Sequence, residues 1–114
     1  VISYHCYAPE DVHAAEIKHL QVFNRPMFCT EYMARTKGST FQTIMPLLKK
    51  NNVGAINWGL VDGKTNTKYS WEEVLPDGSE PKLWFHDILH SDGSPYKIEE
   101  VETIKRLNER NPRP

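Results

Sequence analysis

The chain has 114 residues, of which 39% are hydrophobic, and a formal net charge of −1 from 14 basic and 15 acidic residues. This length suits one globular domain or a part of a larger one. The balanced charge, with no basic block, argues against nucleic-acid binding, and no apolar run is long enough to cross a bilayer. Cys6 and Cys29 are too few for a disulfide framework and lack metal-site spacing, so we expect no metal and no cofactor.

The first residues predict a strand followed by a helix. Residues 1–7 are β-branched or aromatic at most positions, so His5 and Tyr7 share one face of a strand. Residues 11–23 have apolar side chains at helical spacing, and this helix ends before Pro26, which pushes its predecessor out of the helical region. The chain opens inside an apolar–polar segment, which is typical of an excised or processed piece.

A second strand and a second helix come next. The run at 26–31 is apolar in its middle and leads to the carboxylate of Glu31, and its proline fits only the start of a strand. Residues 39–50 predict an amphipathic helix. Ser39 and Gln42 have the spacing of a capping box, so we expect the helix to begin there.

The second half predicts a third strand, a long loop and two helices. Residues 53–58 form the strand, and residues 59–81 show no periodicity but many turn formers. A loop of this length in a compact domain is usually functional or mobile. Residues 83–89 are expected to form a short helix. Residues 95–109 form the last helix, with a serine as N-cap and a proline in its first turn.

The element order indicates an α/β fold. Strands that alternate with helices form right-handed βαβ crossovers and a parallel sheet. Three parallel strands make a poor independent domain, because such sheets need both faces and both edges covered. We therefore expect the chain either to pair with further units of the same fold or to self-associate through its open sheet.

Polar and aromatic side chains follow the three predicted strands. The carboxyl ends of parallel strands lie on the same side of a sheet, where ligands bind, so His5, Tyr7, Glu31 and Trp58 should meet there. A carboxylate can attack or stabilise an oxocarbenium-like carbon. An indole offers a flat platform for a sugar ring, and a phenol or imidazole can orient the carboxylate. This combination predicts a sugar site.

Three short motifs carry a family resemblance: His5-x-Tyr7, Thr30-Glu31-Tyr32 and Asn57-Trp58-Gly59. Their order and spacing resemble the sixth, seventh and eighth strands of clan A glycoside hydrolases, which are retaining (β/α)8-barrel enzymes, and are most similar to the family-two and family-five groups. The resemblance runs from about residue 2 to residue 107. It implies a partial TIM barrel of three parallel strands with flanking helices, forming the C-terminal portion of the enzyme.

The resemblance also implies roles for the residues. Glu31 would be the nucleophile, Tyr7 would donate a hydrogen bond to it, His5 would line the subsite and Trp58 would stack on the sugar. The substrate would be a β-linked poly- or oligosaccharide, and the protein would be secreted or periplasmic.

One departure from the family pattern concerns the second carboxyl group. The family's acid/base glutamate follows an asparagine at the end of the fourth strand, whereas the only Asn-Glu pair here is Asn108-Glu109, in the last helix. Retaining hydrolysis needs two carboxyl groups. The acid/base would therefore lie in an N-terminal part of the same barrel, and residues 1–114 alone would be inactive.

Simpler interpretations remain open at this point. Glu31 could be an ion-paired surface carboxylate, Trp58 a core residue and His5 an ordinary strand histidine. Trp71, in the long loop, is interpreted as an anchor of that loop rather than as a lid over a sugar. The alternative function is a non-catalytic α/β module that binds carbohydrate or a protein partner.

Overall fold

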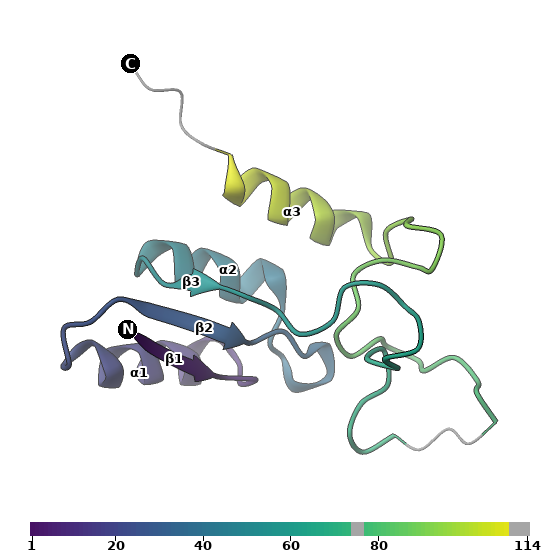
Figure 1. The fold of residues 1–114 in the computed structure, drawn as a ribbon, viewed down its shortest axis with the longest axis horizontal. Helices are drawn as coiled ribbons and strands as arrows, with labels where there is room; N and C mark the ends of the chain where they lie inside the picture. The colour runs from purple at the N-terminus through teal and green to yellow at the C-terminus, as the bar shows by residue number, and fades with distance from the viewer. Residues whose placement is uncertain (74–76, 110–114) are drawn as a thin grey trace.

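The computed structural model describes residues 1–73 and 77–109. It is an α/β structure with a three-stranded parallel sheet in the order β1-β2-β3 (Figure 1). The prediction of a parallel sheet with helical connections is confirmed. The elements in chain order are β1 (Ile2–His5), α1 (Glu10–Gln21), β2 (Met27–Glu31), the 3-10 helix η1 (Arg35–Lys37), α2 (Phe41–Lys50), β3 (Gly54–Ala55) and α3 (Ile98–Asn108).

The register of the sheet contains one irregularity, at the end of β1. Tyr4 lies opposite Cys29, but the register then shifts, so that His5 lies opposite Glu31. In β3, Gly54 lies opposite Phe28, and a Cβ on Gly54 would be only 2.3 Å from the Phe28 ring. Glycine at this position therefore leaves room for the Phe28 ring beside β3.

The helices cover one face of this sheet. The core joins side chains from β2, α1 and α2, and its buried members include Ile17, Cys29, Ile44 and Leu48. On the other face the described part of the chain leaves side chains open to solvent, and Phe28 is 42% exposed there. A parallel sheet is normally covered on both faces, so this one is half covered.

The segment at 83–89 is not a helix, contrary to the sequence-based expectation. Its backbone amides bond outward to the long loop: Phe85 donates to the Lys68 carbonyl at 2.8 Å and His86 to the Thr67 carbonyl at 3.1 Å. Trp84, Phe85 and Ile88 are all buried. A short apolar run indicates burial but does not distinguish a helix from an irregular buried segment, which is why a helix was expected here.

Several boundaries also differ from the expected ones. The third strand spans only Gly54–Ala55 rather than 53–58, and the last helix begins at Ile98 rather than 95. The serine expected as its N-cap, Ser94, instead bonds to Asp92. At the start of α2, the hydroxyl of Thr40 is the cap, because it accepts from the amide of Thr43.

Ser39 does not cap α2. Its hydroxyl is buried and donates to the carbonyl of Tyr32. This bond fixes the chain that leaves β2, so the serine serves the loop after Glu31 rather than the helix.

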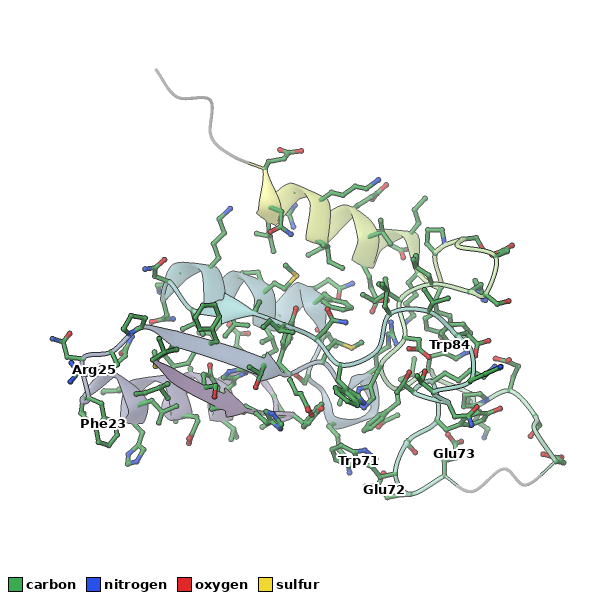
Figure 2. All side chains as sticks on the ribbon, viewed as in Figure 1. Phe23, Arg25, Trp71, Glu72, Glu73 and Trp84 are labelled. Carbon is green, nitrogen blue, oxygen red and sulfur yellow. The ribbon has the colours of Figure 1, made fainter. Side chains whose placement is uncertain are left out.

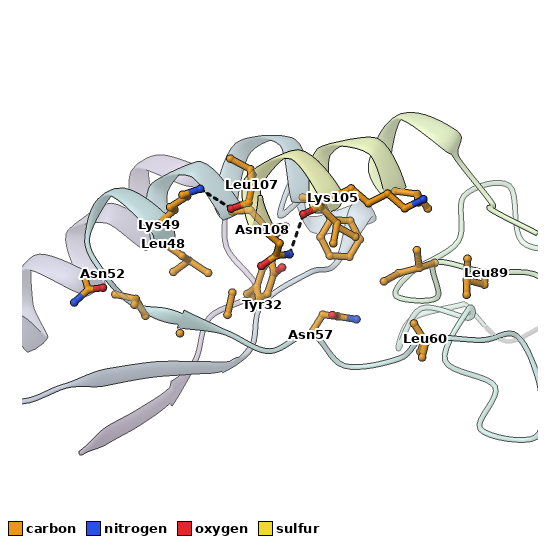
Figure 3. Close-up of a pocket in the computed structure, with 18 residues that line it drawn as sticks. Tyr32, Leu48, Lys49, Asn52, Asn57, Leu60, Leu89, Lys105, Leu107 and Asn108 are labelled. Carbon is orange, nitrogen blue, oxygen red and sulfur yellow. Dashed lines mark hydrogen bonds between the residues drawn. The ribbon is translucent and has the colours of Figure 1, made fainter. Parts of the chain in front are cut away.

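A groove of about 670 Å³ lies between α2, α3 and β3 (Figure 3). Its lining is mostly apolar and includes Phe41, Leu48, Val101 and Leu107. Its polar lining groups come from Tyr32, two lysines and three asparagines, and none of the lining residues is a carboxylate, an imidazole or a thiol. Among the described residues, no helix is long and apolar enough to cross a membrane.

Candidate functional site

Glu31 lies at the carboxyl end of β2 with two predicted partners beside it. The Tyr7 hydroxyl donates a hydrogen bond to Glu31 Oε2, and His5 Nδ1 lies 3.4 Å from the same oxygen. The Glu31 side chain is 22% exposed, so it is accessible without being fully solvated. The register shift at the end of β1 places His5 opposite Glu31. Three of the four predicted site residues therefore lie together.

Tyr7 acts as a donor in this arrangement. Burial raises the pKa of its phenol, and the hydrogen bond and charge of Glu31 raise that pKa further. A phenol that keeps its proton can only donate to an ionised carboxylate. Tyr7 therefore holds one oxygen of Glu31 in place.

Trp58 comes after β3, the third strand of the sheet, rather than after β1 or β2. It is 54% exposed. The next residue, Gly59, has φ +93°, and a Cβ there would lie 2.7 Å from Asp87 Oδ1. Within residues 1–73 and 77–109, no hydrogen bond or ring contact joins Trp58 to Glu31 or Tyr7. Trp58 therefore lies outside the cluster around Glu31.

Two residues that the sequence did not assign to the site complete the cluster. The ring of Tyr7 lies 5.1 Å from Trp71 and 5.5 Å from His86, measured between centroids. Trp71 comes from the long loop, close to the strand ends (Figure 2). His86 comes from the segment expected to be a helix, so its spacing in the sequence carried no signal for the site.

His86 is a buried, neutral histidine. It is 2% exposed, and its burial lowers the pKa of the imidazole although nearby groups, including Asp87 and Glu31, act in the opposite direction. Its Nδ1 lies 2.6 Å from the carbonyl of Met33. A carbonyl only accepts, so Nδ1 carries the proton and donates it to this bond.

The segment that carries His86 is fixed to the chain after β2. Arg35 donates to the carbonyl oxygens of Trp84 at 3.0 Å and Asp87 at 2.8 Å, and its own amide donates to the carbonyl of Phe85 at 3.1 Å. Arg35, four residues after Glu31, thus holds the segment on both sides of His86 through its backbone amide and its guanidinium.

The chemistry available to this cluster is that of a single oriented carboxylate beside aromatic rings. An ionised carboxylate held by a phenol can act as a nucleophile or stabilise a cationic carbon. No group of three or more metal-ligating side chains occurs among the described residues.

Comparisons with known proteins found no match, whether against models of protein families, curated proteins or solved structures.

Proposed function

We propose that this chain is the C-terminal part of a retaining glycoside hydrolase that acts on β-linked poly- or oligosaccharides. The observation that supports this most strongly is the hydrogen bond from Tyr7 to Glu31, made at the carboxyl end of a parallel strand. In this position Glu31 is the nucleophile, Tyr7 and His5 orient it, and Trp58 offers an aromatic surface to the sugar. The proposal includes the secreted or periplasmic location that the family resemblance implies.

In the proposed reaction, an oxygen of Glu31 attacks the anomeric carbon while the bond to the leaving sugar breaks. The product is a glycosyl–enzyme ester, which water then hydrolyses with net retention. Tyr7 keeps its proton and donates to one oxygen of Glu31, so the other oxygen is free to attack. A second carboxyl group protonates the leaving oxygen, and we assign it to a part of the barrel outside residues 1–114.

The open surfaces of the sheet support a partial barrel. The edge strands are β1 and β3, and the face with Phe28 is open among the described residues. The apolar groove reaches β3. Further βα units would cover these surfaces, as closure does in a complete (β/α)8 barrel of about 250 residues.

The test uses the full-length protein and aryl β-glycosides with a good leaving group. Glu31→Ala is expected to reduce kcat by at least about a thousandfold, because the step that it removes is the chemical one. Added azide should restore turnover and give the α-glycosyl azide, since the anion enters from the face vacated by the carboxylate. Glu16→Ala, an exposed carboxylate on α1, is the control and should keep full activity.

Two results separate the proposal from its alternative. Undiminished turnover in Glu31→Ala contradicts the nucleophile assignment. The alternative, a binding module, predicts no turnover by the natural protein. It also predicts that carbohydrate binding survives Glu31→Ala but is lost in Trp58→Ala.

A further inference from the structure

Two of the chain's three tryptophans, Trp71 and Trp84, differ sharply in burial. Trp84 is 2% exposed, stacks on Tyr96 with ring centroids 4.4 Å apart, and donates from its indole nitrogen to Glu80 at 2.9 Å. Trp71 is 61% exposed. Trp84 thus has the contacts of a packing anchor, whereas most of the Trp71 side chain faces solvent.

Trp71 lies one ring away from the proposed nucleophile. Its indole is 5.1 Å from the ring of Tyr7, with an angle of 86° between the planes, and Tyr7 bonds to Glu31. A sugar whose anomeric carbon lies at Glu31 would therefore have its neighbour along the chain within reach of this indole. Apolar C–H faces of sugars pack on indole surfaces of this kind.

The exposed indole is also held in place. It packs against Phe85 with centroids 4.9 Å apart, and the ammonium of Lys37 lies 5.8 Å from its centroid. Lys37 forms an ion pair with Glu72, the next residue in the loop. An aromatic side chain that is fixed before binding loses less conformational entropy when a ligand stacks on it.

We propose that Trp71 forms a second sugar platform, beside the sugar held at Glu31, so that the site takes at least two linked sugar rings. This inference rests on the proposed function. In this proposal the long loop makes the site prefer oligosaccharides over single sugars.

The experiment measures kcat/KM of the full-length protein for two p-nitrophenyl β-glycosides, one carrying a single sugar and the other the matching β-linked disaccharide. Glucose, xylose, mannose and galactose are each tested in this way. Trp71→Ala is expected to lower the disaccharide-to-monosaccharide ratio about tenfold, the effect of losing one aromatic stacking contact. Trp71→Phe should retain most of the ratio. Phe23→Ala is the matched control, since Phe23 is 59% exposed and lies at the other end of the sheet (Figure 2).

If the disaccharide-to-monosaccharide ratio of kcat/KM stays constant in Trp71→Ala, the inference is overturned. This holds also when both kcat/KM values fall together, because the tryptophan then only anchors the loop. Calorimetric titration in the Glu31→Gln background, with and without Trp71→Ala, gives the corresponding ratio of disaccharide to monosaccharide affinity without turnover. Turnover that persists in Glu31→Gln refutes the proposed function. The ratio measured in Trp71→Ala then still shows whether Trp71 binds a second sugar. Binding of none of these sugars refutes both.

Discussion

Arg35 and Glu100 form a buried ion pair through two hydrogen bonds, of 2.8 and 2.7 Å, across 65 residues of sequence. Both side chains are 2% exposed. Because Arg35 also donates to the carbonyls of Trp84 and Asp87, this pair connects the start of α3, the segment around His86 and the chain after β2. The position of His86 in the candidate site thus depends on a contact far from it in sequence.

Removing one partner of this pair should destabilise the chain strongly. Glu100→Gln leaves the guanidinium without a counter-charge, which costs about 3–5 kcal/mol of unfolding free energy for a buried pair. Arg35→Met should cost more, since it also leaves two buried carbonyls without donors. Urea unfolding measures both. Lys37→Met, which breaks an exposed pair, should change the midpoint far less, and an equal effect would contradict a structural role for Arg35.

Tyr7→Phe tests the orientation of the carboxylate. The substitution keeps the ring contacts with Trp71 and His86 but removes the donor to Glu31. A hydrogen bond to a charged group contributes about 1.5–3 kcal/mol, so kcat/KM of the full-length protein should fall by roughly ten- to a hundredfold. Thermal unfolding should shift only slightly. Unchanged kinetics would show that Tyr7 packs beside Glu31 without orienting it.

The stability of the fold should fall at mildly acidic pH. Burial lowers the pKa of both His13 and His86 below the usual 6.5. At pH values between 6.5 and the lowered pKa, the unfolded chain binds more protons than the folded chain. The free energy of unfolding therefore decreases as pH falls, by at most about 1.4 kcal/mol per pH unit for each histidine. Above the usual pKa both states are neutral and the effect is absent.

Urea midpoints at about pH 7.5 and about pH 5.5 measure this effect. The difference between the two midpoints should shrink in His13→Gln and in His86→Gln. The exposed His19, on α1, provides the control, because His19→Gln should leave the difference as it is. An unchanged difference in both buried variants would show that neither histidine causes the acid sensitivity.

Gly59→Ala should disturb both stability and the site. The backbone there has φ +93°, and the added Cβ would lie 2.7 Å from Asp87 Oδ1 and 3.0 Å from His86 Cβ. Strain of this kind costs about 1–3 kcal/mol, which thermal unfolding detects. Gly93→Ala provides the comparison, since Gly93 has φ +87° but no atom within 4 Å of the added Cβ. Equal losses in the two variants would show that backbone conformation alone is responsible.

The sheet and the Tyr7–Glu31 pair were predictable because they depend on local patterns. Alternation along the strand predicted at 1–7 puts His5 and Tyr7 on one face, and parallel pairing brings strand ends together. In the structure β1 ends at His5, so Tyr7 lies just beyond the strand. Trp71 and His86 were not predictable as site residues, because distant contacts place them. His86 reaches the site through backbone bonds to Thr67 and through the contacts of Arg35 with its neighbours.

The helix expected at 83–89 failed for a related reason. Burial there comes from contacts with the long loop and with Tyr96, and no helical stripe is present. A composition rich in apolar residues indicates burial, but it does not distinguish a helix from an irregular buried segment when the run is short.

Covalent trapping tests the central claim most directly. A 2,4-dinitrophenyl 2-deoxy-2-fluoro-β-glycoside transfers its sugar to a nucleophilic carboxylate without an acid catalyst, since its leaving group needs no proton. Mass spectrometry of the treated full-length protein should show one added sugar, in the peptide that contains Glu31, and no adduct in Glu31→Gln. An adduct on another carboxylate, such as Glu72, or no adduct with any of the common sugars, would contradict the assignment of Glu31 as the nucleophile.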